Sequence, residues 1–368
     1  MTKLNELFDE YGQSPWIDNI RRDWLNDGTL ARMVSQGVRG VTSNPSIFAK
    51  ALATSSAYDA LIASSLERDP EALFEELAVA DVRDACDVLS TVHGASKDAF
   101  ASGERRYRDG FVSLEVSPRL AHDTPGTIAA ATRLNATVGR ENVMIKIPAT
   151  NEGLPAIGEA LTRGINVNVT LIFSLERYDQ VLDAWLFGLE SAARAGRDLS
   201  SIASVASFFV SRVDVAVDAL LPDGDPRRGR SANAQAAAAY ELYRRRVNES
   251  RTKELLAKGA QVQRPLWAST STKNPAYDEL LYVDTLVADE TVNTMPDATL
   301  SATLARGNFA RTALASEHSM HEIASELGAL APEVSLTAVT NQLERDGVRS
   351  FVDAYEELLA TVAAKMHP

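Results

Sequence analysis

The feature that most constrains the fold of this chain is the regular alternation of short β-prone runs with longer amphipathic segments. Strands that alternate with helices predict a parallel α/β fold, and eight repeats favour a closed (β/α)8 TIM barrel. The runs that we interpret as strands are Pro15–Ile20, Gly40–Asn44, Phe111–Val116, Asn142–Pro148, Asn166–Phe173, Ile202–Val210, Arg264–Thr270 and Glu290–Met295. The helical segments between them include Ala57–Leu66, Glu71–His93, Pro125–Val138, Gly153–Arg163 and Leu175–Ala195.

A doubly wound parallel sheet is the alternative fold. Sheets of that kind commonly bind nucleotides at a glycine-rich turn that follows the first strand. No glycine-rich phosphate loop or dinucleotide fingerprint follows Pro15–Ile20 in this chain. The pattern therefore favours the barrel over the doubly wound sheet.

We expect one barrel domain over residues 1–368, with extra helices at both ends. A polar, turn-rich loop leads into helices at Ala232–Val247 and Glu249–Ala257, so we interpret residues 221–260 as an enlarged helical connection after strand 6. This segment has too few large apolar residues to form a core of its own. The segment Asp346–Lys365 is predicted to be a helix that packs across one end of the barrel.

Charge and cysteine content limit the classes of partner. The net charge of −13 disfavours nucleic acid and anionic membrane as partners, although a local basic pocket would still accept a small anionic substrate. The single cysteine, Cys86, rules out an internal disulfide framework and fits a reducing, cytoplasmic setting. The polar N-terminal segment does not resemble a signal peptide, and no apolar run approaches the roughly 20 residues of a membrane span.

Lys146 is the most unusual residue of the strand pattern. Side chains alternate between the two faces of a strand, so Val143, Ile145 and Ile147 share one face, and Met144 and Lys146 share the other. If both faces are buried, the charged form of the lysine is disfavoured. A neutral lysine is a nucleophile toward carbonyl groups and can form a Schiff base. A solvated lysine on an edge strand is the alternative interpretation.

Most of the predicted strands also carry polar residues near their carboxyl ends, on alternating positions. The outward face of a barrel strand packs on helices, whereas active sites lie at the carboxyl ends of the strands. These side chains are therefore predicted to converge on one cavity around Lys146, where a costly set of buried polar groups indicates chemistry. They are Asp18, Asn44, Glu115, Asn168, Thr170, Ser207, Arg212 and Ser269.

Each of these residues also has a structural interpretation. Asp18 could be the N-cap of a helix at Arg21–Leu25, Glu115 could be a satisfied core carboxylate, and Asn168 with Thr170 could form a buried hydrogen-bonded pair. Metal chemistry is poorly supported, because His318 and His321 lie at i, i+3 spacing on a polar helical segment that is typical of an exposed helix face.

Five motifs, in this order along nearly the whole chain, resemble those of the transaldolase family. They are Val41–Ile47, Val112–Pro118, Met144–Pro148, Ile165–Ser174 and Ser207–Arg212. The enlarged connection and the segment Pro265–Pro275 resemble the longer bacterial subgroup. The resemblance implies a cofactor-free enzyme of the pentose phosphate pathway that moves a dihydroxyacetone unit from a ketose phosphate to an aldose phosphate. It also implies that a homodimer is common among such proteins.

The resemblance implies a role for each residue that matches the family's motifs. Lys146 would form the Schiff base, and Asp18 would act as the acid and base on the hydroxyl that loses its proton when the carbon–carbon bond breaks. Glu115 and Thr170 would position a water that shuttles protons. Asn44 and Asn168 would hold the hydroxyls of the three-carbon unit, and Ser207 and Arg212 would bind the substrate phosphate.

The chain departs from the family pattern after the seventh strand, where many members have a second phosphate-binding arginine. This chain has Lys273 there, which is the candidate for that role, with Ser269 or Ser271 as its candidate partner. Lysine offers a point charge in place of the planar fork of arginine.

Two competing functions remain open at this stage. The first is a class I aldolase on the same fold, which releases dihydroxyacetone; the related fructose 6-phosphate aldolases have a tyrosine and a glutamine where this chain has Phe209 and Glu115. Phe209 lacks a hydroxyl that could assist protonation of the carbanion, so it favours transfer to an acceptor. The second is a non-catalytic barrel that binds sugar phosphates, against which the intact lysine and both carboxylates argue.

Overall fold

The strands form a single curled parallel sheet in the computed structural model, which describes residues 1–67, 69–330 and 333–366. Within those residues the sheet has seven strands in the order β1-β7-β6-β5-β4-β3-β2. This order contains no reversal of the kind that defines a doubly wound sheet, so the α/β barrel type of architecture is favoured. The strands are β1 (Ser14–Ile17), β2 (Val112–Glu115), β3 (Val143–Pro148), β4 (Val167–Ile172), β5 (Ser204–Phe209), β6 (Gln263–Ala268) and β7 (Val292–Met295).

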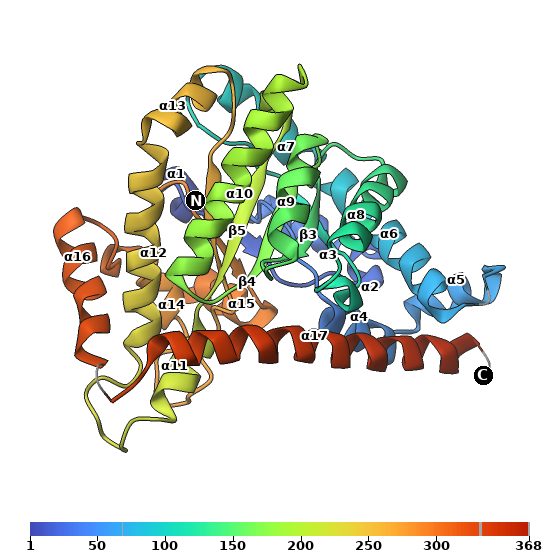
Figure 1. Cartoon of the computed structure of the whole chain (residues 1–368). Coiled ribbons are helices and arrows are strands. Elements are labelled where there is room, and N and C mark those ends of the chain that lie inside the picture. The colour runs from blue at the N-terminus through green and yellow to red at the C-terminus, as the bar shows by residue number, and fades with distance from the viewer. Residues whose placement is uncertain (68, 331–332, 367–368) are drawn as a thin grey trace.

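Helices surround the sheet on its outer side (Figure 1). All five helical segments predicted between the strands contain helix, but Glu71–His93 is divided near Leu89 into α6 and α7. The helices are α1 (Lys3–Asp9), α2 (Arg22–Asn26), α3 (Thr29–Ser35), α4 (Pro45–Thr54), α5 (Asp59–Ser64), α6 (Pro70–Val88), α7 (Ser90–Ala101), α8 (Thr124–Val138), α9 (Gly153–Thr162), α10 (Leu175–Arg194), α11 (Ser211–Asp218), α12 (Ser231–Val247), α13 (Ser250–Ala257), α14 (Leu281–Asp284), α15 (Asp297–Arg306), α16 (Glu317–Ser325) and α17 (Leu336–Met366).

The two faces of β3 belong to two different apolar clusters, as the alternation predicts. Val143, Ile145 and Ile147 pack into the large outer core between the sheet and the helices. Met144 belongs to a smaller inner cluster, which it shares with Trp16, Val205, Leu266 and Val292 of other strands. The face that carries Met144 and Lys146 therefore points into the space enclosed by the sheet.

The predicted strand Gly40–Asn44 is not a strand in the structure. Only Val41 forms bridges, one to Ile17 of β1 and one to Val112 of β2. The reason is local: Asn44 caps α4, and Pro45 has no N–H group to donate to a sheet, so the extended backbone ends after a few residues. Short as it is, this segment bonds to both edge strands of the seven-stranded sheet.

The C-terminal helix crosses one end of the sheet, as predicted for Asp346–Lys365, but it is longer and begins at Leu336. Figure 1 shows α17 as a long red helix that lies across the lower side of the molecule. It contacts α4, α6, α11 and β4. Those contacts place it over the carboxyl ends of the strands.

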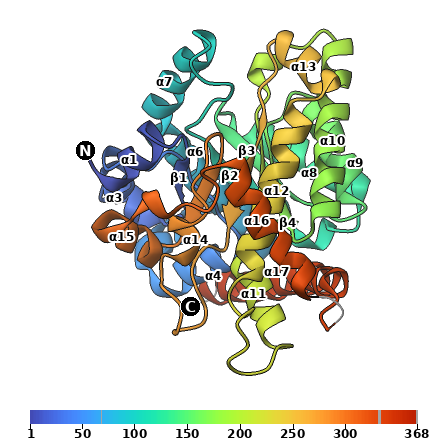
Figure 2. The same cartoon turned by 90° about the vertical axis from the view of Figure 1, so that its left-hand side faces the viewer.

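The connection between β5 and β6 contains α11, α12 and α13. Helix α12 is packed into the molecule: five of its six alanines and Tyr243 are buried. Gln235 Nε2 donates a 2.8 Å hydrogen bond to the carbonyl oxygen of Phe173. Figures 1 and 2 both show α12 beside α16, in agreement with the contacts between them. Among the described residues, no helix has both the length and the apolar character needed to cross a bilayer.

Gly40→Ala tests the packing of the bridging segment. A Cβ atom at Gly40 would lie 2.3 Å from Cε2 of the buried Trp16, so we expect the free energy of unfolding to fall by about 1–3 kcal/mol, the usual cost of overpacking. The control is Gly94→Ala in α7, where a Cβ would meet no atom within 4 Å and alanine should stabilise the helix by about 0.5–1 kcal/mol. Urea denaturation measures both; equal stabilities of the two variants would contradict the packing.

Candidate active site

A cavity of about 130 Å³ lies at the carboxyl ends of the strands, beneath α17. Its lining is dominated by polar and charged side chains from several different strands and loops, as expected for an active site in a barrel. The residues that line it are Asp18, Thr42, Asn44, Lys146, Thr170, Ser207, Phe209, Arg212, Ala268, Ser269, Ser271, Lys273, Thr294, Pro296 and Phe351.

Lys146 is buried in this cavity, with 5% of its surface exposed. Its Nζ atom donates a 3.1 Å hydrogen bond to the carbonyl oxygen of Ser43 and lies 3.4 Å from Oε2 of Glu115. The alternative of a solvated edge-strand lysine is therefore wrong. The Ser43 carbonyl and the Glu115 carboxylate together hold the amine in one position.

Parallel pairing places two more polar residues beside Lys146. Glu115 on β2 and Asn168 on β4 are its register partners on the neighbouring strands. Neither of these two side chains is among those that line the cavity. The three residues form a row across β2, β3 and β4, which we call the Glu115–Lys146–Asn168 row.

The two carboxylates near Lys146 are both displaced from ordinary acidity. Burial raises the pKa of Glu115 to about 7, although the charge of Lys146 opposes that shift. Among the described residues, the only partner of Glu115 Oε2 is Lys146, at the long distance of 3.4 Å. Burial also raises the pKa of Asp18, against the lowering effects of Lys146 and of the Thr42 hydroxyl. Two acids in unlike surroundings are suited to different proton-transfer tasks.

Asp18 is not the N-cap that the local sequence allowed. Helix α2 begins at Arg22, its N-cap is Arg21, and no side chain caps it. The Asp18 carboxylate instead accepts a 2.6 Å hydrogen bond from the hydroxyl of Thr42, which orients it at the cavity wall.

Asn168 is fixed by two hydroxyl groups and does not pair with Thr170. Its Nδ2 donates to Ser113 Oγ at 3.0 Å, and its Oδ1 accepts from Ser207 Oγ at 2.7 Å. Thr170 lies next to a β-bulge, where the register with β5 shifts and Leu171 has a φ of 60°. The bulge turns both Thr170 and Leu171 inward, and the Thr170 hydroxyl has no hydrogen-bond partner among the described residues.

Asn44 has a structural task as well as a place in the cavity wall. Its Oδ1 accepts a 3.1 Å hydrogen bond from the backbone N–H of Ile47 and so caps α4. Capping fixes the side chain where the chain turns from extended to helical, and its Nδ2 is not used by the cap. The amide N–H groups are thus available toward the cavity.

Two cationic side chains stand together at one side of the cavity. The Arg212 guanidinium lies over the ring of Phe209, 5.2 Å from its centroid, and burial lowers its pKa. Lys273 Nζ donates a 2.6 Å hydrogen bond to Ser271 Oγ, and its pKa is lowered by burial and by the charge of Arg212. Ser269, the other predicted partner, bonds with Ser211 at 2.9 Å. The lowered pKa values mean that the charged forms of these two side chains are disfavoured, and a bound anion nearby would favour them again.

Sequence reasoning missed five residues of the cavity wall, which are Thr42, Ala268, Thr294, Pro296 and Phe351. Thr42 lies in the motif Val41–Ile47, and its position two residues before Asn44 in an extended run was a signal for an inward side chain. Phe351 lies on α17, and nothing in the sequence of a C-terminal helix indicates which strand end it will cover.

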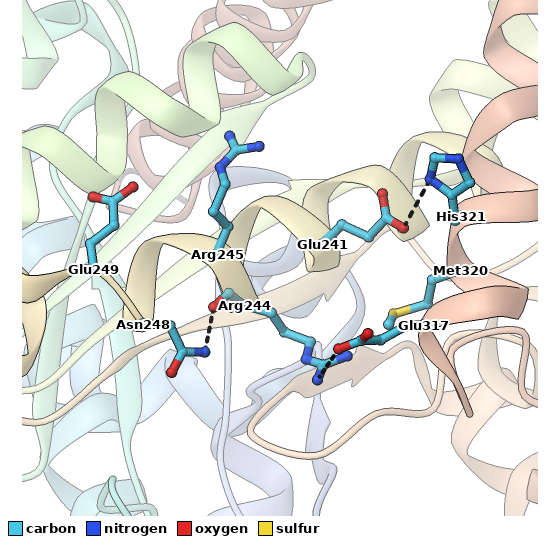
Figure 3. Close-up of a pocket in the computed structure, with 8 residues that line it drawn as sticks. All are labelled: Glu241, Arg244, Arg245, Asn248, Glu249, Glu317, Met320 and His321. Carbon is cyan, nitrogen blue, oxygen red and sulfur yellow. Dashed lines mark hydrogen bonds and ion pairs between the residues drawn. The ribbon is translucent and has the colours of Figure 1, made fainter.

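A larger groove of about 600 Å³ lies away from these residues, between α12 and α16 (Figure 3). Its charges are largely matched: Arg244 donates to Glu317 at 3.0 Å, and His321 Nδ1 lies 3.8 Å from Glu241 Oε1. Over the described part of the chain, no group of three or more His, Cys, Asp or Glu side chains is arranged to hold a metal ion. The buried, convergent groups are those around Lys146.

Comparisons with protein families and with individual proteins agree on the family of this chain. Residues 15–362 match the family described as transaldolase/fructose-6-phosphate aldolase. A transaldolase from Thermobifida fusca is 47% identical, with 99% of this chain and 98% of the relative covered. A transaldolase from Frankia alni is 46% identical over 96% of this chain and 95% of the relative, and one from Mycolicibacterium smegmatis is 46% identical over 95% and 93%. The chain belongs to the transaldolase/fructose-6-phosphate aldolase family.

Proposed function

We propose that this protein is a transaldolase of the non-oxidative pentose phosphate pathway. It would transfer a dihydroxyacetone unit between sedoheptulose 7-phosphate or fructose 6-phosphate and glyceraldehyde 3-phosphate or erythrose 4-phosphate. The observation that carries the proposal is the buried Lys146 amine, held between Glu115 and the Ser43 carbonyl at a cavity with two cations at one side. Family membership and the names of the close relatives support the same reaction.

The first half of the reaction forms and uses a Schiff base. The Lys146 amine adds to the ketone carbon of the donor, and water leaves as the imine forms. Glu115 and Thr170 relay the protons through a water. Two observations support that role: the Thr170 hydroxyl has no hydrogen-bond partner within the described part of the chain, and the pKa of Glu115 is raised. Asp18 then takes the proton of the hydroxyl beside the breaking bond, the aldehyde product leaves, and the bonding electrons pass into the imine to give an enamine.

The second half of the reaction runs these steps in reverse with a new aldehyde. The enamine carbon attacks the acceptor carbonyl, Asp18 returns its proton to the new hydroxyl, and water hydrolyses the imine to release the product ketose. Asn44 and Asn168 would hold the hydroxyls of the three-carbon unit throughout. Because an amide has two N–H groups, Asn168 has a second donor beyond the one that bonds Ser113.

The phosphate group would bind at the cationic side of the cavity, to Arg212, Lys273 and Ser207. Charge-assisted hydrogen bonds to phosphate are the strong ones, and arginine offers them in a planar fork. Lys273 is the candidate for the position of the second arginine, and its bond to Ser271 supports a fixed geometry. This local positive charge accounts for an anionic substrate in a chain of net charge −13.

Phe209 favours transfer over simple cleavage. Its ring is packed against Phe173, with centroids 5.0 Å apart, and carries no hydroxyl that could help water to protonate the enamine carbon. The proposal also includes a closed barrel of one domain over residues 1–368, in which the bridges of Val41 to both edge strands take the eighth position in place of a regular strand. A cytoplasmic setting, no resident cofactor or metal ion, and a homodimer complete it.

Borohydride trapping tests the Schiff base directly. Wild-type protein reduced in the presence of fructose 6-phosphate should gain the mass of the three-carbon adduct on the peptide that contains Lys146. Lys146→Met should fold, because Glu115 next to it can remain protonated near neutral pH, but should give no adduct and no turnover. Peptide mass mapping is the measurement. A folded wild-type protein without an adduct at Lys146 would contradict the proposed function.

The raised pKa of Glu115 predicts a pH dependence of stability. The folded state retains a proton on Glu115 up to about pH 7, whereas an unfolded glutamate loses it near pH 4.3. The stability contributed by this proton is complete below the unfolded pKa and is lost as pH rises through the folded value. Glu115→Gln has no such proton, so its stability relative to wild type should increase over this window. Urea unfolding at a series of pH values measures it, and parallel curves would contradict the shift.

Arg212→Gln tests the phosphate contact. The loss of one charged hydrogen-bonding group should lower kcat/KM for fructose 6-phosphate roughly 10- to 100-fold, equivalent to about 1.5–3 kcal/mol. Unphosphorylated fructose should react as slowly with the variant as with wild type, because it makes no contact with Arg212. Steady-state kinetics with both sugars is the measurement. Equal proportional losses on the two donors would argue that Arg212 acts elsewhere.

A further inference from the structure

An aromatic ring from the C-terminal helix lies over the proposed nucleophile. The ring centroid of Phe351 is 5.6 Å from Lys146 Nζ, and 5% of the residue is exposed. Phe351 lines the same cavity as Lys146 and belongs to the inner apolar cluster that is otherwise built from the sheet and the segments that flank its strands. Helix α17 thus supplies one apolar wall of the cavity, in addition to the wall that Phe209 provides.

The helix comes this close because of one glycine and one bulge. Gly347 lies one turn before Phe351 on the same face of α17. A Cβ at Gly347 would lie 3.1 Å from Cδ2 of Leu171 and 3.3 Å from Cε2 of Phe173, so the backbone of α17 rests directly on the end of β4. Leu171 meets the helix only because its φ of 60° turns it inward.

Polar contacts on both sides of Phe351 hold α17 in place. Before it, Glu344 accepts a hydrogen bond from Arg177 of α10 at 3.2 Å. After it, the Tyr355 hydroxyl donates to Glu71 of α6 at 2.9 Å, and Glu356 accepts from Arg119 at 2.8 Å. Because these contacts reach three separate segments of the chain, they fix both the distance of α17 from the cavity and its rotation about its own axis.

We propose that Phe351 is a specificity-determining residue that keeps the bound three-carbon intermediate from being protonated by solvent. This inference rests on the proposed Schiff-base function. The ring closes the cavity from the side of α17, so that few water molecules can approach the reactive carbon. The enamine therefore persists until an aldehyde enters, and the enzyme transfers the dihydroxyacetone unit in preference to releasing it.

The competing reaction needs no reagent other than water. A proton from a water molecule bonds to the enamine carbon, which gives the iminium form of dihydroxyacetone and hydroxide. Addition of water to the iminium carbon and loss of a proton to that hydroxide follow, the carbon–nitrogen bond breaks, and dihydroxyacetone leaves the free Lys146 amine. The net change consumes one water. Exclusion of water is a recognised means of suppressing such side reactions.

Phe351→Ala tests the proposal through the ratio of free dihydroxyacetone to transferred product. With fructose 6-phosphate as donor, release without an acceptor should increase at least roughly tenfold relative to transfer onto erythrose 4-phosphate, because the water-excluding wall is removed. Phe351→Leu, which keeps an apolar side chain, should show a smaller increase. Gly347→Ala keeps the ring but pushes α17 away from Leu171, so it should shift the ratio in the same direction.

Leu358→Ala is the matched control. Leu358 is fully buried on the same helix but does not line the cavity, so its loss should lower the thermal unfolding temperature and leave the ratio at the wild-type value. An unchanged ratio in Phe351→Ala and Gly347→Ala, with the borohydride adduct at Lys146 intact, would overturn the proposal. So would an equal shift in Leu358→Ala. Absence of the adduct from wild-type protein would instead count against the proposed function.

Discussion

The pairing of β2, β3 and β4 is the constraint on which the candidate site depends. It sets Glu115, Lys146 and Asn168 side by side in one register. A slip of β3 by one residue would expose Lys146 to the outer core and move Ile145 and Ile147 inward, so burial of the outer apolar face fixes the register. The apolar residues that stabilise the barrel wall thereby determine where the amine lies.

This arrangement has an electrostatic cost that the surrounding groups limit. Moving an ion out of water costs several kcal/mol even after the protein relaxes. Here the cost of burying the Lys146 amine is offset by its contacts with the Ser43 carbonyl and with Glu115. Burial also makes Glu115 a weaker acid. Glu115 can therefore hold a proton beside the amine near neutral pH. Imine formation requires a proton donor and acceptor beside the amine, and the Glu115 carboxyl lies 3.4 Å from it.

The sequence predicted what depends on local periodicity and missed what depends on distant packing. The alternation around Met144 and the helix at Asp346–Lys365 are local patterns, and both are confirmed. The strand Gly40–Asn44 was wrong because Asn44 and Pro45 commit the chain to a helix, a signal that was present but outweighed by the eightfold repeat. Phe351 could not be assigned, because its contact with Lys146 arises from where α17 docks and not from its own sequence.

The bulge in β4 connects the chemistry with the covering helix. A non-glycine residue in the left-handed region costs about 1–2 kcal/mol, and Leu171 is such a residue. In a regular strand Thr170 and Leu171 would face opposite ways. The bulge directs Thr170 into the cavity and Leu171 against Gly347, so one strained residue serves both the proposed proton relay and the seat of α17. A strand without the bulge would satisfy one of these needs at the expense of the other, which is a physical reason for the strain to be retained here.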